Sequence, residues 1–131
     1  MFVDASALTA ILAGEPDAAA LVARLQRARQ RLISPLAVWE TTIALARILD
    51  LALPEAQQAV QDYLALATIQ VIAVSPKAAA GAIEAFDRFG KGRHPAGLNF
   101  GDCFAYACAR SYRMPLLFKG NDFPLTDIQP G

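Results

Sequence analysis

The 131-residue chain has few of the side chains that bind transition metals, with one histidine and two cysteines. A single histidine excludes a nuclease site built on two histidines, and it excludes a histidine-rich zinc site. Cys103 and Cys108 are too few for a disulfide framework, and in a helix they would point about 140° apart. We therefore expect two reduced cysteines that pack inside a cytoplasmic protein.

An excess of charge of one sign and a long apolar run are also absent. The 12 basic and 12 acidic side chains leave a formal net charge of zero, so any nucleic-acid contact must come from a local basic patch. The most apolar run, 63–74, is too short to cross a membrane. No signal-peptide pattern is present, because a basic start is missing and Asp4 interrupts the first apolar stretch. We expect a soluble, cytoplasmic protein without a membrane segment.

What the chain does have is typical of one globular domain over 1–131. Hydrophobic residues make up 55% of it and charged residues 18%, and its length is enough for a core without staples. Short β-like runs are predicted at 1–3, 32–33, 69–74 and 115–118, with a fifth edge strand at 126–129. Helical patterns are predicted at 5–13, 17–30, 35–49, 54–67, 76–89 and 101–112. Short apolar strands separated by helices predict an α/β fold, a parallel sheet covered on both faces.

Four acidic residues are expected at one edge of that sheet. Asp4 directly follows the first strand and Asp122 follows the fourth after a turn. Asp102 opens the helix that leads into the fourth strand, and Glu40 lies one turn into the helix after the second. The carboxyl ends of parallel strands share one edge, where ligands bind. Individually Asp102 is also typical of a first helical turn and Asp122 of a turn, whereas Glu40 has apolar helical neighbours and needs a cation or hydrogen bonds.

A divalent cation is the partner that such a group of acids favours. Close carboxylates repel one another, and without a cation some of them protonate or move apart. Oxygen ligands without histidine or cysteine suit Mg²⁺ or Mn²⁺ and do not suit Zn²⁺. A site of this kind activates water and neutralises charge on a phosphate. The sequence therefore predicts phosphoester hydrolysis.

Basic residues near the predicted edge favour a phosphate polymer as the substrate. Lys91 and Arg93 lie in the glycine-rich loop that leads into the Asp102 helix, and Lys119 precedes the Asp122 turn. We interpret these three as RNA contacts, and the alternative for each is a solvated surface residue. Ser6, two residues after Asp4, is expected to cap the first helix or to hold a metal-bound water.

Four motifs occur together in one order along the chain: FVDASA at 2–7, SPLAVWE at 34–40, LNFGDC at 98–103 and LLFKGNDF at 116–123. With them the whole chain resembles a VapC-type toxin, the PIN-domain ribonuclease of a type II toxin–antitoxin pair. The resemblance implies a PIN-like three-layer α/β/α domain with a short central parallel sheet. It also implies a Mg²⁺- or Mn²⁺-dependent endoribonuclease, usually a homodimer, neutralised by a small VapB-like antitoxin whose C-terminal segment reaches the active site.

Residue by residue, the acidic quartet of that family falls on Asp4, Glu40, Asp102 and Asp122, and its small hydroxyl residue on Ser6. Asp4 and Asp102 are expected as direct metal ligands in a site that cleaves RNA with a metal-activated water. Glu40 and Asp122 are expected to position the metal, its waters or a second ion. For the fourth polar group, Asn121 and Asp127 stay open beside Asp122.

Two other functions compete with this interpretation. A Mg²⁺-dependent phosphomonoesterase or phosphotransferase needs a second aspartate two residues after the nucleophilic one, and here that position is Ser6. A catalytically inert PIN-like module that only binds RNA or protein predicts the loss of some of the four acids, and all four are present.

Overall fold

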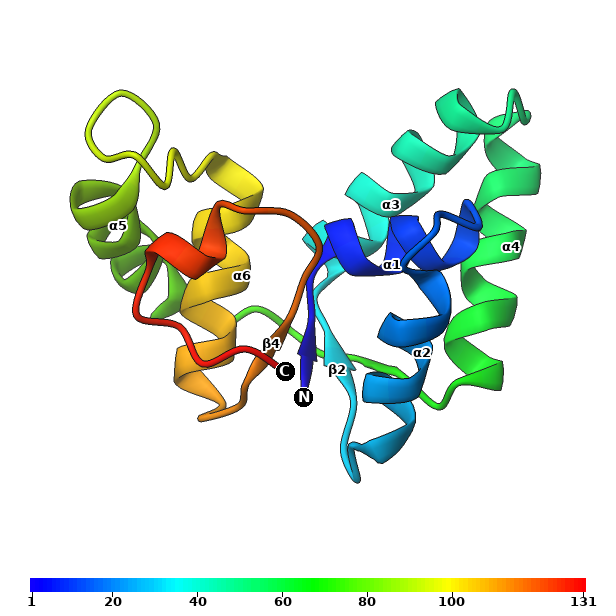
Figure 1. The fold of residues 1–131 in the computed structure, drawn as a ribbon, viewed down its shortest axis with the longest axis horizontal. Coiled ribbons are helices and arrows are strands. Elements are labelled where there is room, and N and C mark those ends of the chain that lie inside the picture. The colour runs from blue at the N-terminus through cyan, green and yellow to red at the C-terminus, as the bar shows by residue number, and fades with distance from the viewer.

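The computed structural model describes residues 1–131 and places a four-stranded sheet between two layers of helices (Figure 1). The strands are β1 (Phe2–Val3), β2 (Leu32–Ile33), β3 (Gln70–Val71) and β4 (Leu116–Leu117), in the order β3-β2-β1-β4. All three pairings are parallel. The helices are α1 (Ala5–Leu12), α2 (Ala18–Arg27), α3 (Pro35–Ile48), α4 (Leu53–Leu66), α5 (Ala78–Phe89) and α6 (Phe100–Ser111), followed by the 3-10 helix η1 (Phe123–Leu125).

Strands β1, β2 and β4 each send one side chain to each face of the sheet, since successive residues of a strand point in opposite directions. Phe2, Leu32 and Leu116 join a core with side chains of α5 and α6. Val3, Ile33 and Leu117 join a second core with side chains of α1, α2, α3 and α4. The predicted parallel α/β fold with both faces covered is therefore confirmed.

The strands are shorter than the sequence predicts. The run at 69–74 pairs with its neighbour only over Gln70–Val71, both exposed at the sheet edge. The fifth strand predicted at 126–129 was wrong. In its place Thr126 Oγ1 donates 2.7 Å to the carbonyl of Phe123, and the chain meets the sheet at a single bridge between Leu116 and Pro130. The bridge consists of two hydrogen bonds, from the Leu116 N–H to the carbonyl of Gln129 at 2.9 Å and from the Gly131 N–H to the carbonyl of Leu116 at 2.8 Å.

Polar caps fix where the site-bearing helices begin. Ser34 Oγ accepts a 3.1 Å hydrogen bond from the Ala37 N–H, and Pro35 occupies the first turn of α3, where its missing N–H costs nothing. The helix predicted at 76–89 begins two residues later, at Ala78, and has no side-chain cap. No helix is both long and apolar enough to cross a membrane.

The two cysteines, Cys103 and Cys108, are both free and buried in α6. They pack in the core shared by α5, α6 and the sheet. This agrees with the expectation of reduced packing residues.

Candidate active site

A cleft of about 460 Å³ opens where the carboxyl ends of β1 and β4 meet the helices. Its charged and polar wall combines residues from the end of β1, from α1 and the turn after it, from α3, from the start of α6 and from the segment after β4: Asp4, Ser6, Thr9, Glu15, Glu40, Arg47, Asn99, Asp102 and Lys119. Three of the four predicted acids therefore lie in one cleft, although they are up to 98 positions apart in the chain, from Asp4 to Asp102. The parallel topology brings them together, as the sequence predicts.

Asp4 is held at the end of β1 by both backbone and side-chain hydrogen bonds. Its N–H donates 2.9 Å to the carbonyl of Leu117, which continues the β1–β4 ladder by one residue. Its Oδ2 caps α1, accepting from the Ser6 N–H at 3.0 Å and from Ser6 Oγ at 2.5 Å. Ser6 Oγ in turn accepts 3.0 Å from the Lys119 N–H. Burial raises the pKa of Asp4, and the Ser6 hydrogen bonds oppose that rise.

Glu40 faces the same cleft from α3. Burial, and then the charges of Asp4 and Asp102, raise the pKa of Glu40 to about 7. The start of α6 packs directly against its carboxylate, because a Cβ placed on Gly101 would overlap the Glu40 oxygens. Its carboxylate thus stays half-buried between two other acids.

Asp102 serves both the fold and the cleft. It closes a capping box at the start of α6, in which the Asn99 N–H donates 3.1 Å to Asp102 Oδ2 and the Asp102 N–H donates 2.9 Å to Asn99 Oδ1. Burial raises the pKa of Asp102 to about 6 against the Asn99 hydrogen bond, and the charges of Asp4 and Asp122 add to the rise. Asp102 therefore both caps α6 and lines the cleft.

The structure separates the candidates for the fourth polar group. Asp122 is exposed just before η1, outside the wall of the cleft, yet near enough for its charge to raise the pKa of Asp102. Asn121 beside it is exposed. Asp127 lies elsewhere, because its carboxylate accepts from Tyr106 at 2.5 Å and from Arg88 and Arg110 at 3.0 and 3.2 Å.

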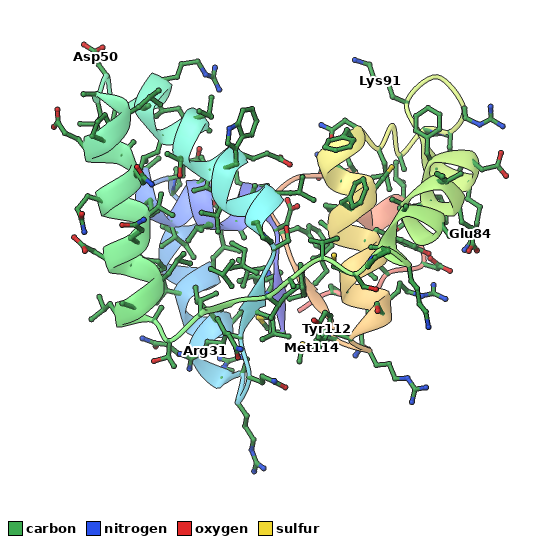
Figure 2. All side chains as sticks on the ribbon, turned by 180° about the vertical axis from the view of Figure 1, so that it is seen from behind. Arg31, Asp50, Glu84, Lys91, Tyr112 and Met114 are labelled. Atoms are coloured by element: carbon green, nitrogen blue, oxygen red, sulfur yellow. The ribbon has the colours of Figure 1, made fainter.

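Of the three predicted RNA contacts, only Lys119 lines the cleft, where its ammonium group pairs with Glu15 and lies 3.5 Å from Asp17. Lys91 is exposed in the loop beyond α5, away from the cleft wall (Figure 2). Arg93 turns back along that loop to pair with Asp87 of α5 at 2.7 Å. The loop therefore does not carry these two cations to the acids.

Arg47 is a cleft residue that the sequence interpretation missed. It lies on α3 seven positions after Glu40, with Ala44 between them, and all three line the cleft. Spacings of four and seven place side chains on one helix face. That pattern was available in the sequence and is the signal by which Arg47 could have been found.

The donor chemistry of the cleft fits a hard divalent cation. Asp4, Glu40 and Asp102 offer only oxygen atoms, and none of the ion pairs in the structure involves them. Burial raises the pKa of each, and the charges of neighbouring acids add to the rise for Glu40 and Asp102, an environment that favours a hard cation as partner. No group of three histidine, cysteine, aspartate or glutamate side chains in this structure is arranged so that it could hold a metal ion. The fit therefore lies in the kind and charge of the donors.

The chain matches known proteins over nearly its whole length. The model of the PIN domain family matches residues 1–129. A Ribonuclease VapC of Mycolicibacterium smegmatis is 41% identical, covering 98% of this chain and 97% of its own. Ribonuclease VapC28 of Mycobacterium tuberculosis is 43% identical, covering 98% and 96%.

A crystal structure of Mycobacterium tuberculosis VapC20, described as a toxin that cleaves the sarcin–ricin loop, superposes with a TM-score of 0.73 at 20% identity, over 98% of each chain. This likeness and the family match confirm the predicted PIN-like fold. The chain therefore belongs to the VapC family of PIN-domain ribonucleases.

Proposed function

We propose that this protein is a Mg²⁺- or Mn²⁺-dependent endoribonuclease, that it is the toxin of a type II toxin–antitoxin pair, and that it acts in the cytoplasm. The observation that carries the proposal is the cleft in which Asp4, Glu40 and Asp102 share one space while none of them takes part in an ion pair. The relatives named as VapC ribonucleases support RNA as the substrate.

In this proposal the residues of the chain have separate tasks. Asp4 and Asp102 hold the cation, because both are anchored by hydrogen bonds at fixed ends of β1 and α6. Glu40 and Asp122 orient water around it, and Ser6 keeps Asp4 in place through its 2.5 Å hydrogen bond. When bound, a hard cation supplies positive charge for the phosphate and makes a nearby water more acidic. Hydrolysis then replaces one ester oxygen of the phosphodiester by an oxygen from water.

Lys119 is the one predicted RNA contact that we place at the reacting phosphate, since it lines the cleft. An incoming phosphate must compete there with Glu15 and Asp17 for the ammonium group. RNA binding by Lys91 and Arg93, and a supporting role for Asn121, stay predictions.

The test is cleavage of a single-stranded RNA with Mg²⁺, with Mn²⁺ and with EDTA. We expect cleavage only with metal, and its loss in Asp4→Asn and in Asp102→Asn, because each substitution keeps the size of the side chain and removes its charge. Asp62→Asn, on the exposed side of α4, is the matched control and should cut like the wild type. Cleavage that continues in EDTA, or in Asp102→Asn, would refute the metal proposal.

We also propose a homodimer and a VapB-like antitoxin as partners. Residues 37–67 are a candidate for the dimer contact because the stretch is rich in apolar residues, although α4 turns Ala56, Val60 and Leu64 into the core. The apolar side chains left exposed in that stretch include Trp39, Leu49 and Leu53. A second exposed apolar surface is a groove of about 470 Å³ between α5 and α6.

A further inference from the structure

The cleft extends along α3 to one basic residue, Arg47. This helix leads away from the carboxyl edge of the sheet (Figure 1), so Glu40 lies near the acids and Arg47 lies farther out. Seven residues at 1.5 Å each separate the two by roughly 10 Å along the helix axis. Ala44 lies between them on the cleft wall, and its small side chain leaves that part of the wall open.

Arg47 is the cation of the cleft without an acidic partner. It is exposed and takes part in none of the ion pairs or side-chain hydrogen bonds of the structure, whereas Lys119 is paired with Glu15 and Asp17. A guanidinium group binds a phosphate through two parallel N–H donors. An unpaired arginine in a cleft whose other end is acidic therefore suits a ligand that carries negative charge at regular intervals.

We propose that Arg47 binds a backbone phosphate next to the one that is cleaved, and so sets how the RNA strand lies along α3. This inference rests on the proposed ribonuclease function and adds a substrate-binding residue to it. The axial separation from Glu40 favours a phosphate beside the reacting one over the reacting phosphate itself. Its contribution is the same before and during the reaction, so its loss should raise KM and change kcat little.

The experiment measures RNA binding by fluorescence anisotropy over a range of salt concentrations. A labelled single-stranded oligoribonucleotide is used, and every variant also carries Asp102→Asn so that the RNA stays intact. Arg47→Ala is compared with Arg47→Lys and with Arg29→Ala. Arg29 is exposed just before β2, at the opposite edge of the sheet. Arg29→Ala therefore removes the same charge as Arg47→Ala, but at a place distant from the cleft.

We expect Arg47→Ala to weaken binding about 3–10-fold and to reduce the slope of log affinity against log salt by about 0.7, the value for one phosphate contact on a single strand. Arg47→Lys should keep the slope, and Arg29→Ala should keep both slope and affinity. In the active background, Arg47→Ala should raise KM. An unchanged slope in Arg47→Ala, in a protein that binds and cuts RNA, overturns the inference alone. A protein that neither binds nor cuts RNA overturns the proposed function, and the inference falls with it.

Discussion

At the scale of single residues, three carboxylates are kept close although each disfavours the charge of the others. Asp4 and Asp102 cannot move apart, because each one also caps the helix that carries it. Glu40 is held by the close approach of Gly101. Burial, and after it the charges of the neighbouring acids, raise the pKa of Glu40 to about 7 and that of Asp102 to about 6.

These raised pKa values predict how the stability of the metal-free protein depends on pH. The folded chain keeps a proton on Glu40 up to about pH 7, whereas the unfolded chain releases it near its ordinary pKa of 4.5. Since the folded state binds more protons in this window, the contribution of Glu40 to stability is fully present below about pH 4.5 and is lost as the pH rises through 7. Asp102 acts in the same direction.

Thermal unfolding in EDTA should therefore give a lower Tm at pH 8 than at pH 5.5. Glu40→Gln, which removes the charge, should reduce that difference, while Asp62→Asn should leave it unchanged. A Tm that rises from pH 5.5 to pH 8 in the wild type would contradict the prediction. Adding Mg²⁺ at pH 8 should raise the Tm, because a ligand of the folded state stabilises it.

At the scale of elements, the site depends on how the start of α6 meets α3. Gly101 lies in the first turn of α6, where alanine would normally favour a helix by up to about 1 kcal/mol. Here the added Cβ would overlap the Glu40 carboxylate. The glycine is required by this contact and not by its backbone conformation.

We expect Gly101→Ala to lower RNA cleavage at least 10-fold, because the added Cβ pushes Glu40 out of position. The loss of a group that orients metal ligands typically costs at least about this much activity. Chemical denaturation measures the loss of stability that the overlap with Glu40 causes, and a cleavage assay measures the loss of activity. The double variant Gly101→Ala with Glu40→Ala should recover stability without recovering cleavage. If Gly101→Ala alone keeps full activity, the contact with Glu40 does not matter for function.

At the scale of the whole molecule, two apolar cores lie on opposite faces of one small sheet, and apolar side chains remain outside both of them. Trp39, at the start of α3, is 65% exposed, and Leu53, at the start of α4, is 55% exposed. Exposed apolar side chains that occur together are typical of a surface that binds another protein. They are the basis for expecting a dimer.

Light scattering at micromolar concentration should give twice the 14.0 kDa mass of the chain. Leu53→Asp should shift the protein toward the monomer if the contact uses the junction of α3 and α4. Lys77→Asp, at an exposed position before α5, is the control and should stay dimeric. A wild type that is monomeric at this concentration would remove the dimer proposal. A dimer that survives Leu53→Asp would move the contact to another surface.

Much of the fold and the acidic half of the site followed from the sequence alone. Apolar strands between helices leave few arrangements besides a parallel sheet covered on both faces. That topology brings Asp4, Glu40 and Asp102 to one edge of the sheet although they are far apart in the sequence. The ends of the elements were less predictable. Hydrogen-bond partners decide them, as the single bridge at Pro130 shows.

Which cations meet those acids was decided only by the tertiary structure. Arg93 and Lys91 are near Asp102 in the sequence, yet an ion pair with Asp87 turns Arg93 toward α5 and the loop keeps Lys91 outside the cleft. Arg47 is distant in sequence from Asp4 and Asp102, yet it shares their cleft because α3 forms one of its walls. Long basic side chains reach whichever acid or open space lies nearest in three dimensions. Local sequence therefore determines where the backbone places a carboxylate more closely than where a long cation ends.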